Sequence, residues 1–106
     1  MRFNTKQKVI MLSALNKYGW QKQADIAIEE MSELTKALIK DRRYGTLETL
    51  KDIYEEIADV LIIVEQLRLA FFPESIDYYV NQKLERLEER LREEATDEQG
   101  DCFGNR

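Results

Sequence analysis

A single proline, Pro73, interrupts this chain of 106 residues, and apolar residues recur along it at the three- and four-residue spacings of an α-helix. Only four glycines are present, and two of them, Gly19 and Gly45, stand at positions where a helix can stop. No segment shows the alternation that is typical of a β-strand. The sequence therefore predicts an all-α fold.

These breaks divide the chain into four predicted helices, at about residues 5–17, 21–42, 47–71 and 74–95. Thr46 is suited to cap the third helix, and Phe72-Pro73 is suited to end it. Residues 1–95 predict a single domain, whereas residues 96–106 are polar and predict a disordered tail. We therefore expect one four-helix bundle.

The third helix is apolar on most sides between Ile53 and Leu69, and a helix that is apolar all round is buried all round. A domain this small cannot easily bury one helix completely. We therefore expect a homo-oligomer, either a dimer or a tetramer, that completes the bundle. On the second helix, the expected core stripe is Ala24, Ala27, Ile28, Met31, Leu34 and Leu38.

Composition argues against several functional classes. The chain lacks a run of about eighteen apolar residues, so we expect no membrane-spanning helix, and its N-terminus lacks the apolar core of a signal peptide. The lone Cys102 fits a reducing cytoplasm. A formal charge of −5 argues against nucleic-acid binding by bulk charge. The absence of histidine excludes Ser-His and Cys-His catalysis within one chain.

Two acid-x-x-acid pairs, Glu30 with Glu33 and Glu56 with Asp59, lie on the flanks of the second and third helices. Residues three apart share a helix face, so two packed helices would gather four carboxylates at one place. Such a group needs counter-charge, and oxygen ligands suit Mg²⁺, with Mn²⁺ as a substitute. Asp52 extends the second pair along one acidic line, and is either a further ligand or without a role.

These acids could also be accounted for without a metal. Acidic pairs on solvated helix faces are common, and Lys83, Arg86 and Arg90 could instead neutralise the carboxylates. On the fourth helix these cations share a stripe with Tyr79 beside the apolar residues, where a metal-bound polyphosphate could be held. Lys83 and Arg86 could equally pair with glutamates of their own helix, and for Arg90 such pairing is the favoured interpretation.

The two acidic motifs resemble those of the all-α nucleoside triphosphate pyrophosphohydrolases, a superfamily that includes the MazG-like enzymes and the dimeric dUTPases. Residues 29–34 read Glu-Glu-Met-Ser-Glu-Leu, similar to the MazG-type Glu-Glu-Leu-Gly-Glu-Leu, and the spacer of residues 34–55 has a length typical of the family. Residues 81–86 resemble the family's Asn-x-Lys-x-x-Arg step, and residues 20–23 its Trp/Gln segment.

The resemblance implies a MazG-like bundle that hydrolyses a nucleoside triphosphate to the monophosphate and pyrophosphate, in the house-cleaning of nucleotide pools. It implies that Glu30, Glu33, Glu56 and Asp59 bind Mg²⁺, with a glutamate of the first pair as general base. The implied substrate-binding residues are Asn81, Lys83 and Arg86, with Trp20 stacking on the base and Gln23 reading its edge. Simple core packing of Trp20 is an equal alternative.

The main alternative is a non-enzymatic oligomeric helical adaptor or regulator that has the same fold, with its acids paired to Lys and Arg. A helix-turn-helix DNA binder is disfavoured by the acidic charge and by the lack of a basic recognition helix. The sequence leaves open which nucleotide is the substrate and how many metal ions bind.

Overall fold

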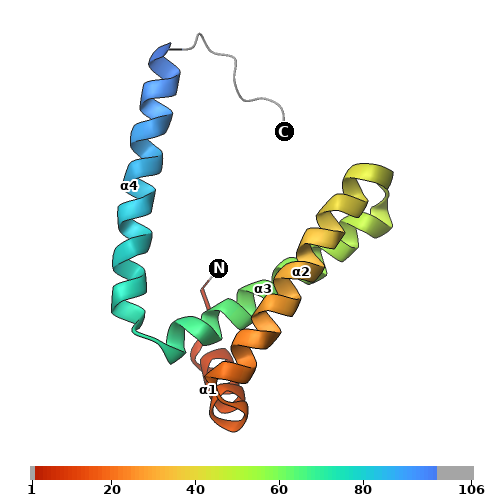
Figure 1. Cartoon of the computed structure of the whole chain (residues 1–106), viewed down its shortest axis with the longest axis vertical. Helices are drawn as coiled ribbons and strands as arrows, with labels where there is room; N and C mark the ends of the chain where they lie inside the picture. Colours follow the sequence, from red (N-terminus) through yellow and green to blue (C-terminus); the bar gives the residue numbers. More distant parts are fainter. Residues whose placement is uncertain (1, 98–106) are drawn as a thin grey trace. The chain divides into compact units, whose positions relative to one another are not determined.

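The computed structural model describes residues 2–97, in which four helices follow one another (Figure 1). The helices are α1 (Thr5–Tyr18), α2 (Trp20–Tyr44), α3 (Leu47–Ala70) and α4 (Pro73–Asp97). No strand occurs in residues 2–97, and the prediction of an all-α fold is confirmed. Each predicted helix end lies within two residues of the observed one.

The chain divides into two compact units, Met1–Phe72 with α1 to α3 and Pro73–Arg106 with α4. The predicted tail begins inside α4, because the hydroxyl of Thr96 donates to the carbonyl of Arg92 at 2.9 Å. Residues 98–106 of that predicted tail lie outside the described residues. None of the described helices combines the length and apolar character that crossing a membrane requires.

The predicted helix stops are confirmed at both central glycines. Gly19 ends α1 with φ of 87°, and Gly45 ends α2 in the left-handed region with φ of 57°. The N–H of Gly45 donates to the carbonyl of Asp41 at 2.8 Å, which satisfies a carbonyl of the last turn. A side chain other than hydrogen would be strained at this φ.

The turn between α2 and α3 is held by a small hydrogen-bond network. The hydroxyl of Thr46 caps α3 by accepting the N–H of Thr49 at 3.1 Å, as the sequence predicts. The buried hydroxyl of Thr49 donates to the carboxylate of Asp41 at 2.7 Å. This bond crosses from the end of α2 to the start of α3 and fixes how the two helices meet.

α2 and α3 lie side by side as an antiparallel hairpin (Figure 1). Each of the two helices has three buried residues, and on each helix these three lie along a single line. The positions of each line follow one another in steps of three and four residues, as in a coiled coil. We call these two lines the seam. The seam comprises Trp20, Gln23, Ala27, Glu30, Leu34, Ala37 and Asp41 on α2, and Thr49, Asp52, Glu56, Asp59, Ile63, Gln66 and Ala70 on α3.

Most seam residues are small or polar, so the apolar core within one chain is small. Among the described residues the buried apolar side chains are Met11 of α1, Ala27 and Ala37 of α2, and Ile63 of α3. α1 lies where α2 begins and α3 ends (Figure 1). The expected core stripe of α2 is only partly buried, since Ile28 is 62% exposed.

The larger apolar residues of the hairpin follow the seam residues by one position on both helices. The same offset on two antiparallel helices turns both sets to the same side of the hairpin, which we call the apolar face. Its exposed or half-buried members include Ile28, Met31, Leu38, Ile57, Val60 and Val64. A folded chain in water rarely leaves such a face uncovered, which indicates an interaction surface.

Replacing Thr49 with Val should destabilise the fold by about 1–2 kcal/mol, because it leaves the carboxylate of Asp41 without its donor and removes half of the cap. Chemical denaturation of the metal-free protein would measure this change. Thr35→Val is the matched control, because the hydroxyl of Thr35 is exposed and bonds only to its own helix at the carbonyl of Met31. An equal loss in both variants would contradict the role assigned to the turn.

Candidate functional site

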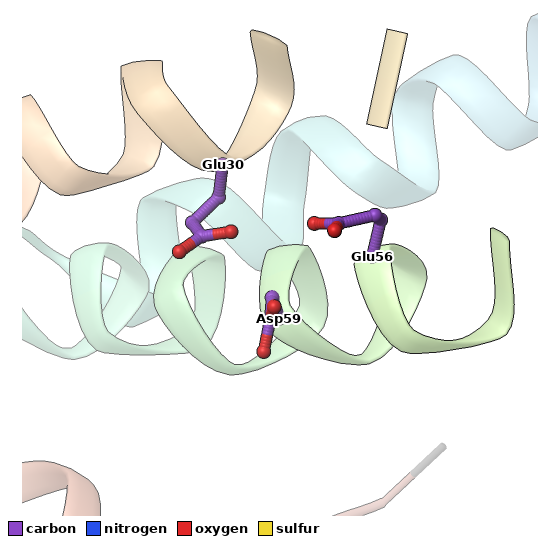
Figure 2. A group of neighbouring side chains, drawn as sticks. All are labelled: Glu30, Glu56 and Asp59. Carbon is purple, nitrogen blue, oxygen red and sulfur yellow. The ribbon is translucent and has the colours of Figure 1, made fainter. Parts of the chain in front are cut away.

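Three carboxylates meet at the middle of the seam. Glu30 comes from α2, and Glu56 and Asp59 come from α3, with one oxygen of each lying within 4.8 Å of the others. Figure 2 shows the side chains of Glu30 and Glu56 reaching toward one another from facing helices, with Asp59 one turn further along α3. Glu30 and Glu56 are half-buried, whereas Asp59 is exposed.

The seam spacing explains why these three side chains converge. Glu56 and Asp59 are three residues apart, so they share the face of α3 that meets α2. Glu30 occupies the corresponding line of α2, between the buried residues Ala27 and Ala37. The backbone of the hairpin therefore brings the carboxylates together before any ligand is considered.

No basic side chain balances the three carboxylates in the ion pairs identified among the described residues. Those pairs join Glu33 to Lys36 at 3.5 Å, Glu55 to Lys51 at 4.0 Å and Glu65 to Arg68 at 3.2 Å. Atom Oε1 of Glu56 is buried and has no hydrogen-bond partner. A buried carboxylate oxygen without a donor is costly, so the geometry leaves room for a cation or a proton.

The electrostatics of the group agree with this geometry. Partial burial, followed by repulsion from Asp59 and Glu56, raises the pKa of Glu30 above its ordinary value. Partial burial, followed by repulsion from Asp59 and Glu33, raises the pKa of Glu56. Both shifts mean that the charged form of each carboxyl is less favourable in the folded chain than in water, and a bound cation would remove the same repulsion.

The fourth predicted ligand, Glu33, lies outside the group of three. Its side chain is 50% exposed and its carboxylate is 3.5 Å from the Nζ atom of Lys36. It still acts on the group, because its charge contributes to the raised pKa of Glu56. Asp52, half-buried one turn before Glu56 on the seam, contributes to the same shift.

Trp20 lies at the open end of the seam. Its ring packs edge-on against Phe71, with 5.3 Å between centroids, and is 45% exposed. The ring borders a groove of about 490 Å³ that also involves Asn16 and Ser13 of α1 and Ala70 of α3. Trp20 is thus partly exposed beside this groove, and both base stacking and core packing of its ring stay predictions.

Gln23 lies inside the seam, where it is 5% exposed. Its Nε2 atom donates to Oε1 of Gln66 at 2.7 Å, and Gln66 is equally buried. The remaining amide oxygen of Gln23 is buried without a partner. That Gln23 reads a base edge stays a prediction, and in this structure its amide is engaged with Gln66.

The predicted phosphate-binding residues Asn81, Lys83 and Arg86 belong to α4 in the second unit, where all three are exposed. Their association with a substrate stays a prediction, as does pairing of the α4 cations with the acids. Two further residues were not expected from sequence, Gln66 and Phe71. Gln66 continues the line of Asp52, Glu56 and Asp59, so seam spacing could have found it, whereas nothing in the pattern singles out Phe71.

Comparisons of the chain with models of known protein families, with curated proteins and with solved structures find no match. The resemblance to the all-α nucleoside triphosphate pyrophosphohydrolases therefore depends on the sequence motifs themselves.

Substituting Gln for Glu56 should raise the melting temperature of the metal-free protein at pH 7, because it removes a charge that the folded state disfavours. The raised pKa means that the folded chain binds more protons than the unfolded chain does at a pH above the ordinary pKa of a glutamate. The stability of the wild type should therefore fall as the pH rises through this range, and the fall should be smaller in Glu56→Gln. Thermal melts in chelator between pH 5 and 8 would measure both effects.

The neighbouring substitution Glu55→Gln is the control, because the side chain of Glu55 is 62% exposed and faces Lys51. It should change the melting temperature and its pH dependence much less than Glu56→Gln does, because the charge of Glu55 contributes to the raised pKa of Glu56 only after burial, Asp59 and Glu33. A wild-type stability that rises with pH over this interval, or a destabilised Glu56→Gln variant, would contradict the repulsion described for the group.

Proposed function

We propose that this protein is a metal-dependent pyrophosphohydrolase of the all-α, MazG-like type, which converts a nucleoside triphosphate to the monophosphate and pyrophosphate. The observation that supports this most is the convergence of Glu30, Glu56 and Asp59 within 4.8 Å. These residues come from the two motifs that resemble the family's acidic signature. House-cleaning of nucleotide pools is the proposed role.

The residues present fit a divalent cation of the Mg²⁺ or Mn²⁺ kind. The group offers carboxylate oxygens, which are hard ligands, and one of them, Oε1 of Glu56, is buried without any other partner. Glu30, Glu56 and Asp59 would hold the cation, with Glu33 one turn away as the fourth ligand. When bound, the cation supplies charge for the triphosphate oxygens and acidifies a water molecule.

Glu30 is the general base in this proposal. A carboxylate has two oxygens, so Glu30 could hold the cation with one oxygen and accept a proton with the other. Glu30 accepts a proton from the attacking water, whose oxygen forms a bond to phosphorus as the bond to the leaving pyrophosphate breaks. The products are the nucleoside monophosphate and pyrophosphate.

Residues outside the carboxylate group would bind the rest of the substrate. Lys83 and Arg86 would neutralise the charge that develops on the leaving pyrophosphate, with Asn81 as a hydrogen-bonding neighbour. The partly exposed Trp20, which lines a groove, would stack on the base. Which base is preferred is left to experiment.

The proposal includes a second copy of the chain that covers the apolar face, in a dimer or tetramer that completes the bundle. Within one chain Ile57, which follows the half-buried Glu56, is 42% exposed, and Val64 on the same face is 44% exposed. Symmetric pairing of two such faces would bury them and would withdraw the neighbouring carboxylates further from water. This arrangement agrees with the small core of a single chain.

Pyrophosphate release from a panel of nucleoside triphosphates is the direct test. With Mg²⁺ the wild type should release pyrophosphate from at least one of them, and Glu56→Gln should lower kcat by about a hundredfold or more, because it removes charge where the cation binds. Glu55→Gln should retain activity, because its carboxylate points to solvent beside Lys51.

Failure of every nucleotide, together with no stabilisation by Mg²⁺ or Mn²⁺, would favour an oligomeric adaptor or regulator. Stabilisation by the cation without pyrophosphate release would retain the metal site and reject these substrates. Release that is unaffected by chelator would reject the metal-dependent chemistry altogether.

Replacing Val64 with Glu should dissociate the proposed oligomer, because it places a charge in the centre of the apolar face. Sedimentation equilibrium should give a multiple of 12.6 kDa for the wild type and a single-chain mass for the variant. Leu47→Glu is the control, because Leu47 is 85% exposed at the start of α3. This variant should have the same mass in solution as the wild type. A wild type of single-chain mass would exclude this pairing.

A further inference from the structure

We propose that the buried amides of Gln23 and Gln66 are positioning residues, which hold α2 and α3 in the alignment that brings Glu30 opposite Asp59. The inference rests on the proposed metal site, because its role is to keep the carboxylates together before a cation binds. The comparisons assign nothing to this pair, and the sequence motifs do not include Gln66.

The alignment follows from equal spacing on the two helices. Glu30 follows Gln23 by seven residues on α2, and Gln66 follows Asp59 by seven residues on α3. Because the helices are antiparallel, one register places Gln23 against Gln66 and Glu30 against Asp59. The two contacts are about 10 Å apart along the seam, since seven residues separate them on each helix. A hydrogen bond at one point therefore constrains the other.

The carboxylates lie between two hydrogen bonds that cross the seam. At the closed end of the hairpin, Thr49 donates to Asp41, and at the open end Gln23 donates to Gln66 at 2.7 Å. Between the open-end bond and the carboxylates, the seam contains the buried side chains of Ala27 from α2 and Ile63 from α3, an apolar contact without a directional bond. The acids themselves repel and favour separation. The amide pair adds a directional bond across the seam beside this contact.

The energetics of the pair favour positioning over stability. Both amides are 5% exposed, and the oxygen of Gln23 is buried without a donor, which costs free energy relative to an apolar pair of similar size. Buried polar residues in helical seams are known to select one register at the expense of stability. The expected result of removing both amides is thus a chain that is at least as stable but less precisely aligned.

The decisive variant is Gln23→Leu with Gln66→Leu, and the probe is Mn²⁺ alone, with no nucleotide. Free Mn²⁺ measured by electron paramagnetic resonance should show about tenfold weaker binding than the wild type, the loss typical of residues that orient metal ligands. The metal-free melting temperature should be equal to the wild type or higher. Because no base is present, a role of Gln23 in base recognition would not change this measurement.

Two further variants complete the test. Gln66→Leu alone removes the acceptor of Gln23, so it should also weaken Mn²⁺ binding, whereas Gln21→Leu, an exposed position of α2, should have no effect. Wild-type affinity in the double Leu variant would overturn the proposal, and so would its failure to fold, since the pair would then be a stability element. Wild-type Mn²⁺ affinity in Gln66→Leu would overturn it too.

A metal-independent measurement separates this proposal from the proposed function. Spin labels on Asp25→Cys and Leu61→Cys, both exposed positions, are placed on a Cys102→Ser background, and the labelled chain is diluted with excess unlabelled chain so that distances within one chain dominate. The distance distribution should be narrow with both amides present and broader in the double Leu variant. If the wild type binds no Mn²⁺, the metal site is wrong, and the distances alone decide on the alignment. Equal distributions in the two proteins would reject it.

Discussion

The hairpin brings three carboxylates together, and the repulsion between them is the constraint that the other contacts of the hairpin must offset. Glu30, Glu56 and Asp59 occupy seam positions, where a helical pair ordinarily places its apolar residues. Partial burial and the neighbouring acids raise the pKa of Glu30 and of Glu56 in consequence. The alanines beside these acids let the helices approach closely, and hydrogen bonds at both ends of the seam oppose the repulsion between them.

A polar seam changes where the apolar residues lie. Ile28 follows Ala27, and Ile57 follows Glu56, so the large side chains are carried to one side of the hairpin and stay about half exposed. The chain has enough apolar surface for a core, but a single hairpin does not enclose it. The same arrangement that concentrates the acids therefore leaves an apolar face beside them.

Helix positions could be predicted from sequence because their signals are local. Gly19, Gly45 and Thr46 end and begin helices through their own backbone preferences and caps, and the structure places them as predicted. The convergence of Glu30 with Glu56 and Asp59 could be predicted as well, from three-residue spacing on two helices. The exposure of Ile28 could not, because a helical wheel shows which residues share a face but not which face meets the neighbour. Gln66 belongs to no motif, and only its place on the line of Asp52, Glu56 and Asp59 could have pointed to it.

The exposed apolar face and the unbalanced carboxylates both follow from the polar residues that occupy the seam. Had apolar side chains filled the seam, the hairpin would bury its own core and keep its acids in solvent. With acids and amides in the seam, the chain lacks that stability, and a bound cation or a partner would restore part of it. A cation would relieve the charge at Glu56, and a second copy would cover Val64, only eight residues further along the same helix. Binding at one of these places lowers the dielectric or the charge at the other, so the two events should favour one another.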